Sequence, residues 1–152
     1  MGGHSYPSVL VHAIFSTKMR RNSIPAEKLE NLWRYFGGIA RRHHIPLIRA
    51  GGTRNHAHLL MALPATKTLA DLIGTLKSNS SRWLSPKFEW QVGYGAFSVS
   101  ASNREKVIQY IETQEKHHKK MTCSVNAKIG GRQIGGKSRT LCRPSGARML
   151  LV

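Results

Sequence analysis

Four stretches of the chain are rich in apolar and β-branched residues and predict β-strands. They cover residues 8–16, 46–51, 55–64 and 94–99. The third stretch alternates with period two, which places successive side chains on opposite faces. One of its faces is wholly apolar and must pack on a core; it carries Ala57, Leu59, Met61 and Leu63. The other face carries His56, His58, Leu60 and Ala62.

Apolar residues at helical spacing predict three helices between and after these strands. The first begins after Ser23, the second is capped by Thr68 and stops at Ser85, and the third begins at Ser102. The predicted order is therefore β-α-β-β-α-β-α. Its first six elements match an α+β, ferredoxin-like or RRM-like βαββαβ sheet with both helices on one face. We expect His56 and His58 to look out over the open face of that sheet.

The two histidines of the third strand are candidate metal ligands. Their Cα atoms would lie ~7 Å apart on one face of the strand. Two imidazoles at this spacing can hold one divalent metal ion, and oxygen ligands in the remaining positions would suit Mg²⁺ or Mn²⁺. The alternative is a pair of surface or stacked histidines, because the chain contains eight.

The third helix carries candidate partners for this pair. Tyr110 and Gln114 are spaced one helical turn apart, ~6 Å along the axis. A helix over the open face could bring Tyr110 to the metal, which would favour attack on a polarised phosphate, and Gln114 could add an amide oxygen ligand. The alternatives are a tyrosine at the edge of the core and a solvated glutamine.

Charge points to a nucleic-acid partner. The 152 residues include 24 Lys and Arg against 7 Asp and Glu, a net charge of +17. All acidic residues precede residue 121, and residues 122–152 show no clear period. We therefore expect one domain over residues 1–121 and a basic, flexible tail over 122–152. The DNA contacts that we nominate, whose alternative is solvated surface charge, are Arg20, Arg21, Lys77 and Arg82.

Several classes of protein are disfavoured by what the sequence lacks. It has no run of 18 apolar residues and no basic segment followed by an apolar one at its start, so we expect neither a membrane partner nor secretion. Cys123 and Cys142 stand outside any metal-type spacing and suggest reduced thiols in the cytoplasm. No Gly-x-x-x-x-Gly-Lys-Ser/Thr motif occurs, so we expect no nucleotide cofactor.

Four motifs together resemble those of the single-tyrosine HUH transposases. This insertion-sequence-200-like group includes relatives associated with repetitive extragenic palindromes (REP). The motifs are TKMRR at residues 17–21, NHAHLL at 55–60, GYGAFSVS at 93–100 and YIETQ at 110–114. The resemblance covers residues 6–121. Family members usually continue with a more acidic, amphipathic segment, which residues 122–152 do not resemble.

The resemblance implies a transposase that cleaves and rejoins single-stranded DNA. Carried onto this sequence, it makes Tyr110 the nucleophile that forms a 5′-phosphotyrosine link and leaves a free 3′-hydroxyl. His56, His58 and Gln114 would hold Mg²⁺ or Mn²⁺ at the scissile phosphate. Family members bind DNA hairpins and form homodimers in which the tyrosine helix of one subunit often serves the histidines of the other.

Two binding functions remain as alternatives to catalysis. One is an RNA-recognition domain of the same fold, in which aromatic residues on the open sheet face stack on bases. The Lys/Arg-Gly-Phe-type signature of that domain is absent from this sequence. The other is a decayed or domesticated transposase that binds hairpin DNA without cutting it.

Overall fold

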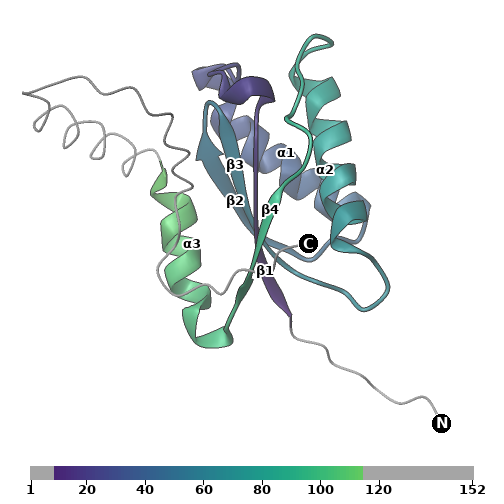
Figure 1. Ribbon diagram of the computed structural model, residues 1–152, viewed down its shortest axis with the longest axis vertical. Helices are drawn as coiled ribbons and strands as arrows, with labels where there is room; N and C mark the ends of the chain where they lie inside the picture. The colour runs from purple at the N-terminus through teal and green to yellow at the C-terminus, as the bar shows by residue number, and fades with distance from the viewer. Residues whose placement is uncertain (1–8, 115–152) are drawn as a thin grey trace, which may run out of the picture.

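The computed structural model describes residues 9–114, which form a mixed α+β fold (Figure 1). In chain order the strands and α-helices are β1 Leu10–Ser16, α1 Leu29–Arg42, β2 Leu47–Thr53, β3 His56–Ala62, α2 Leu69–Leu84, β4 Gly95–Val99 and α3 Arg104–Glu112. Three single-turn 3₁₀ helices occupy Lys18–Arg20, Ala26–Lys28 and Ala101–Asn103. The predicted α+β class and order of elements are confirmed. The predicted boundary at residue 121 and the basic tail lie outside the described residues.

The four strands form one sheet in the order β2-β3-β1-β4, and every neighbouring pair is antiparallel. In this register Ile14 of β1 lies opposite His58 of β3, and His12 of β1 lies opposite Phe97 of β4. Residues directly opposite one another in a sheet point to the same face. The register therefore brings chemistry-bearing side chains from β1, β3 and β4 onto one face.

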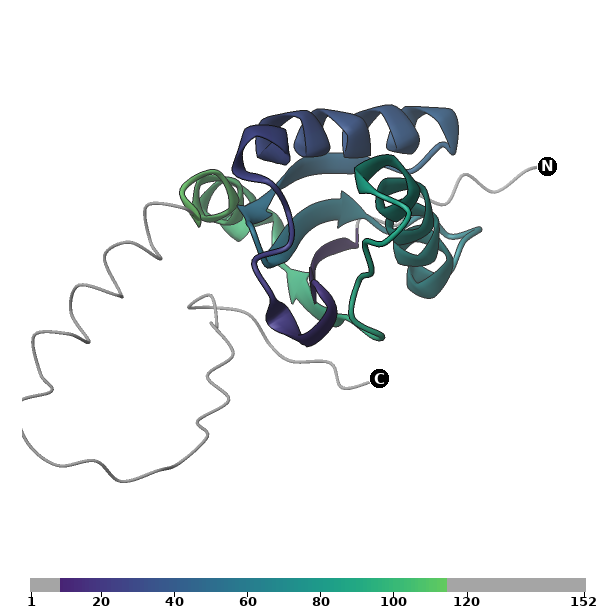
Figure 2. The ribbon, with the colours of Figure 1, turned by 90° about the horizontal axis from the view of Figure 1, so that it is seen from above.

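Helices α1 and α2 cover the opposite face of the sheet (Figure 2). The apolar stripe of each helix packs against the apolar face of β1 and β3, as the alternation predicts. Thr68 caps α2, because its side-chain oxygen accepts a hydrogen bond of 3.1 Å from the backbone N–H of Asp71. The largest fully buried side chains of this core are Phe36, Ile24, Leu32, Leu59, Met61, Leu72, Ile73 and Leu76.

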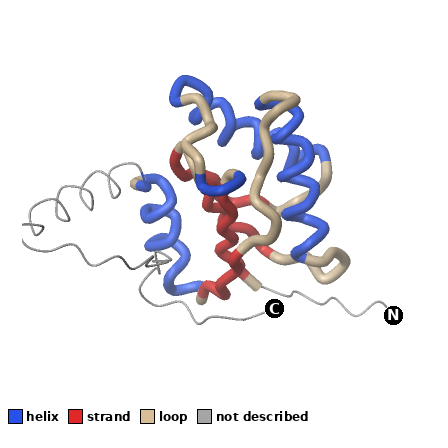
Figure 3. The backbone as a smooth tube through the Cα atoms, turned by 45° about the horizontal axis from the view of Figure 1, so that its top comes forward, coloured by secondary structure: helices blue, strands red, loops and turns tan. Residues whose placement is uncertain are grey.

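Helix α3 lies on the other side of the sheet, over β2 and β3 (Figure 3). Its buried residues form a smaller apolar cluster with Leu10 of β1 and Leu60 of β3. The α3 residues of this cluster are Val107, Ile108 and Ile111. No helix within residues 9–114 is long and apolar enough to cross a membrane.

Two consecutive glycines lie inside β2. Gly51 and Gly52 pair with His58 and Ala57 of β3, and the turn comes later, at residues 54–55. A Cβ on Gly51 would stand 2.7 Å from the backbone oxygen of Ile111, so the glycine lets α3 approach the sheet closely. Gly52 has a φ of +149° and would place a Cβ 2.2 Å from the backbone oxygen of His56.

Candidate metal and nucleophile site

His56 and His58 lie side by side on the sheet face that α3 covers. Their ring centroids are 4.9 Å apart, and their ring planes meet at 72°. The expectation that these imidazoles look out over an open face is wrong, because only 8% of His56 and 1% of His58 is exposed. Helix α3 and neighbouring side chains of β1 bury them, so any metal held here would sit in a largely dehydrated site.

The hydrogen bonds of His56 set its tautomer. Its Nδ1 lies 2.6 Å from Oδ1 of Asn55 and 2.9 Å from Oγ1 of Thr53, and the Thr53 hydroxyl donates to the same Asn55 oxygen over 3.1 Å. An amide oxygen only accepts hydrogen bonds, so Nδ1 of His56 carries the proton. A neutral imidazole protonated at Nδ1 has its lone pair on Nε2, which is therefore the atom suited to ligate a metal.

A third histidine, His12, contacts the pair from β1. Its Nε2 lies 2.9 Å from Nδ1 of His58, and the two rings stack with centroids 5.1 Å apart and 26° between their planes. His12 is fully buried, and burial lowers its pKa from 6.5 to about 4. Its Nδ1 has no hydrogen-bond partner within the described part of the chain.

If Nε2 of His58 binds a metal ion, the ring proton of His58 must be on Nδ1, and Nδ1–H then donates its hydrogen bond to His12. Nε2 of His12 is the acceptor in this arrangement, and its lowered pKa keeps the ring neutral and able to accept. Sequence reasoning missed this residue. The alternation of the first strand could have identified it, because alternate residues share a face and His12 therefore lies on the same face as Leu10, Ile14 and Ser16.

Tyr110 of α3 lies against both of these imidazoles. The centroid of its phenol ring is 5.6 Å from that of His58 and 6.0 Å from that of His12, with ring planes at 84° and 80°. A single chain therefore brings together the tyrosine and the histidines that sequence analysis selected. The nucleophilic role of Tyr110 stays a prediction.

Gln114 follows α3, two residues beyond its last residue, Glu112. It is 1% exposed, and its Nε2 donates a 2.9 Å hydrogen bond to the backbone oxygen of Tyr110. This bond fixes the amide beside the tyrosine. Residues 9–114 contain no group of three His, Cys, Asp or Glu side chains that could hold a metal ion. A metal site of histidines alone is thus not formed there, and the predicted role of Gln114 as third ligand remains a prediction.

The nominated DNA contacts divide by position. Arg20 is exposed and lines a cavity of about 200 Å³ together with His56. Arg20 is held near the site because its N–H donates to Thr17 over 2.9 Å, and the N–H of Thr17 donates to the backbone oxygen of Asn55 over 2.9 Å. Arg21 is also exposed and follows directly in the chain.

The other two nominees lie on α2. The ammonium of Lys77 donates to the backbone oxygens of Gln91 and Gly93 over 2.6 and 3.0 Å, and burial lowers its pKa. Lys77 therefore holds the loop before β4. Arg82 is exposed and donates from Nε to the Ser78 backbone oxygen over 3.2 Å. Since α2 covers the opposite face of the sheet, the structure does not bring Arg82 to the histidines.

The chain is similar to known transposases in sequence and in fold. The family described as "Transposase IS200 like" matches residues 5–114. The ISDra2 transposase TnpA of Deinococcus radiodurans is 24% identical over 114 residues, which cover 68% of this chain and 81% of that protein.

Two solved structures share the fold. One is a Deinococcus radiodurans R1 protein assigned as a transposase, with a TM-score of 0.57 and 25% identity, covering 75% of this chain and 97% of its own. The other is a REP-associated tyrosine transposase bound to a REP hairpin, with a TM-score of 0.59 and 13% identity, covering 78% of this chain and 74% of its own.

Proposed function

This chain belongs to the IS200-like transposase family, and we propose that it cleaves and rejoins single-stranded DNA through a 5′-phosphotyrosine intermediate. The observation that carries the proposal is the contact between the phenol of Tyr110 and the buried histidine cluster. The Tyr110 ring lies 5.6 Å from that of His58, and both belong to one chain. Hairpin-bearing DNA is the proposed substrate, since a structural neighbour is a transposase bound to a REP hairpin.

In the proposed cleavage step, Oη of Tyr110 attacks the phosphorus of a DNA phosphodiester. An Oη–P bond forms and the bond from phosphorus to the 3′ oxygen breaks. The phenol gives up its proton, and the departing 3′ oxygen takes one up, so the number of protons is unchanged. The phosphotyrosine then accepts attack by a 3′-hydroxyl, which restores the phosphodiester and the free phenol without ATP.

His56, His58 and Gln114 are the residues that we propose hold Mg²⁺ or Mn²⁺. The two rings fit this role, because each uses Nδ1 for a hydrogen bond to a neighbouring side chain and so presents Nε2 as the ligand atom. The amide of Gln114 is buried next to Tyr110 and carries an oxygen suited to a hard cation. When bound, the metal ion supplies Lewis-acid polarisation of the phosphate.

Within the site, His12 acts as a positioning residue. Its Nε2 accepts a hydrogen bond from Nδ1–H of His58, and this bond orients the His58 ring and fixes its tautomer. Asn55 does the same for His56. The homodimer implied by the family resemblance stays a proposal; sedimentation equilibrium of the full chain measures it directly.

A hairpin oligonucleotide with a single-stranded flank, incubated with Mn²⁺, tests the proposal. We expect a protein–DNA adduct that survives denaturing electrophoresis and is absent from Tyr110→Phe. Tyr35→Phe is the matched control, because Tyr35 stacks on Trp83 in the helix layer on the opposite face. It should form as much adduct as the wild type. DNA binding without adduct under Mg²⁺ or Mn²⁺ would instead favour a non-catalytic hairpin-DNA or RNA binding protein of the same fold.

A further inference from the structure

We propose that the exposed half of the α3-facing sheet surface binds a nucleobase of the strand held at the histidine pair. This surface, here called the β1–β4 platform, consists of Ile14, Ser16, Gly95 and Phe97. The inference rests on the proposed function for the strand's position, and it adds the class of ligand recognised beside the scissile phosphate.

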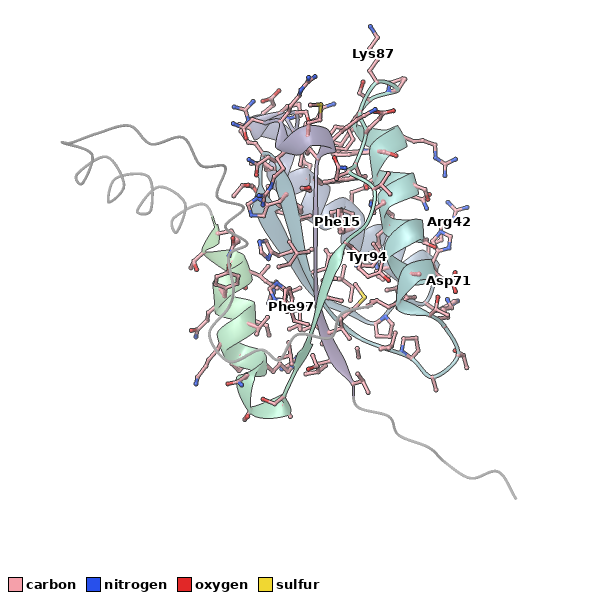
Figure 4. All side chains as sticks on the ribbon, in the orientation of Figure 1. Phe15, Arg42, Asp71, Lys87, Tyr94 and Phe97 are labelled. Carbon is pink, nitrogen blue, oxygen red and sulfur yellow. The ribbon has the colours of Figure 1, made fainter. Side chains whose placement is uncertain are left out.

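The coverage of the sheet leaves this surface available. Helix α3 packs mainly on β2 and β3 and reaches the other two strands around Leu10, His12 and Val99. Among the described residues, none from α3 lines the cavity beside Ile14, Ser16, Gly95 and Phe97. All four platform residues are half-buried, whereas the neighbouring His12 and His58 are fully covered. Figure 4 shows Phe97 on the side of β4 that faces α3. The platform is thus an apolar surface directly beside the candidate site.

A cavity of about 200 Å³ stands over the platform and reaches His56. Its lining combines the aromatic side chain of Phe97 with Tyr94, which is 39% exposed, and with the cationic Arg20. The Phe97 ring lies 6.3 Å from that of His12, so it continues the row of rings that includes His58. A base entering this cavity would meet an aromatic ring next to the residues that we propose hold the metal ion.

Gly95 contributes by lacking a side chain. A Cβ at this position would lie 3.6 Å from the ring of Phe97, which is ordinary contact and would fill space beside the aromatic face. The glycine therefore keeps the ring accessible without being required by its backbone conformation. An alanine at position 95 fits the fold and narrows the cavity, which makes Gly95→Ala a second variant that does not depend on truncating Phe97.

Charge and chemistry select a nucleobase over other occupants. The net charge of +17 disfavours a second copy of this chain at a surface rimmed by Arg20, and favours a polyanion. Arg20 belongs to none of the ion pairs formed within residues 9–114, so its guanidinium is available for a phosphate. Aromatic side chains with nearby cations are the means by which proteins bind single-stranded DNA without reading its sequence.

The test separates base contacts from phosphate contacts. The probes are fluorescein-labelled oligothymidylate of ten residues and an abasic oligomer of the same length, with dissociation constants measured in EDTA by fluorescence anisotropy. We expect Phe97→Ala to weaken oligothymidylate binding by about 10-fold or more and to leave abasic binding unchanged. Gly95→Ala should act in the same direction. Arg20→Ala should weaken both probes by similar factors.

Phe88→Ala is the matched control, because Phe88 packs against Trp90 on the α1–α2 side of the sheet. It should change neither dissociation constant. Equal losses on both probes for Phe97→Ala, or no loss on either, would overturn the inference, as would a change in sedimentation showing that Phe97 mediates self-association. The binding assay does not depend on DNA cleavage. A wild-type protein that forms no phosphotyrosine adduct would contradict the proposed function, whereas the anisotropy measurements would still test base binding by Phe97.

Discussion

Acid should destabilise the metal-free protein through His12. Its pKa is lowered from 6.5 to about 4 in the folded state by burial. The unfolded chain therefore binds a proton at higher pH than the folded chain, and stability is complete above about pH 6.5 and declines as pH falls toward 4. A shift of this size corresponds to about 3 kcal/mol in total, of which about 2 kcal/mol is lost by pH 5.

Urea denaturation in EDTA, followed by circular dichroism at pH 7.5 and at pH 5, measures the loss. His12→Gln is the comparison, because a glutamine places an uncharged oxygen near Nε2 of the histidine and can still accept the proton of His58. The variant should lose about 2 kcal/mol less than the wild type between the two pH values. Subtracting the two curves removes the contributions of every group other than residue 12.

Parallel pH profiles for the wild type and His12→Gln would refute the reasoning. They would show that His12 takes up its proton in the folded protein as readily as in the unfolded chain. That result is incompatible with a ring that is fully buried against His58, Phe97 and Tyr110. A more stable wild type at pH 5 than at pH 7.5 would also contradict the sign worked out above.

Three further outcomes are expected. Mn²⁺ affinity measured by electron paramagnetic resonance should fall about 10- to 100-fold in His12→Phe, which cannot accept the His58 proton, and be largely restored in His12→Gln; equal affinities would remove the positioning role. Gly51→Ala should cost about 1–3 kcal/mol of folding stability and reduce adduct formation, because its Cβ would meet the Ile111 backbone at 2.7 Å, whereas Gly74→Ala, with nothing within 4 Å, should not destabilise. Arg20→Ala should reduce the slope of log affinity against log salt by about 0.7 for single-stranded DNA, and Arg82→Ala should leave it unchanged; the reverse pattern would place the DNA on the helix layer.

Local pattern was sufficient to predict most of the architecture. The alternation around Leu59 and Met61 correctly assigned one face of β3 to the core, because period two decides facing within a strand whatever its neighbours are. The apolar stripes of α1 and α2 were equally informative, and Thr68 marked the start of α2 through its hydrogen bond to the next turn. These features depend on residues only a few positions apart.

Features that depend on contacts between distant segments escaped prediction. The pairing of His12 with His58 joins residues 46 positions apart, and it requires the β1–β3 register, which no local pattern encodes. The need for glycine at position 51 comes from the approach of Ile111 in α3, 60 positions later in the chain, and no local pattern shows it. The burial of His56 likewise depends on the packing of α3 over β3, which joins distant parts of the chain.

The turn between β2 and β3 links the position of Arg20 to that of His56. Asn55 uses its side chain to orient the ring of His56 and its backbone oxygen to hold Thr17, to which the backbone of Arg20 is bonded. One residue thus connects the backbone that carries Arg20 with the imidazole of His56. The backbone of Arg20 therefore keeps its place relative to the His56 ring, and under the proposed function the length of the Arg20 side chain limits which phosphate near that ring it could contact.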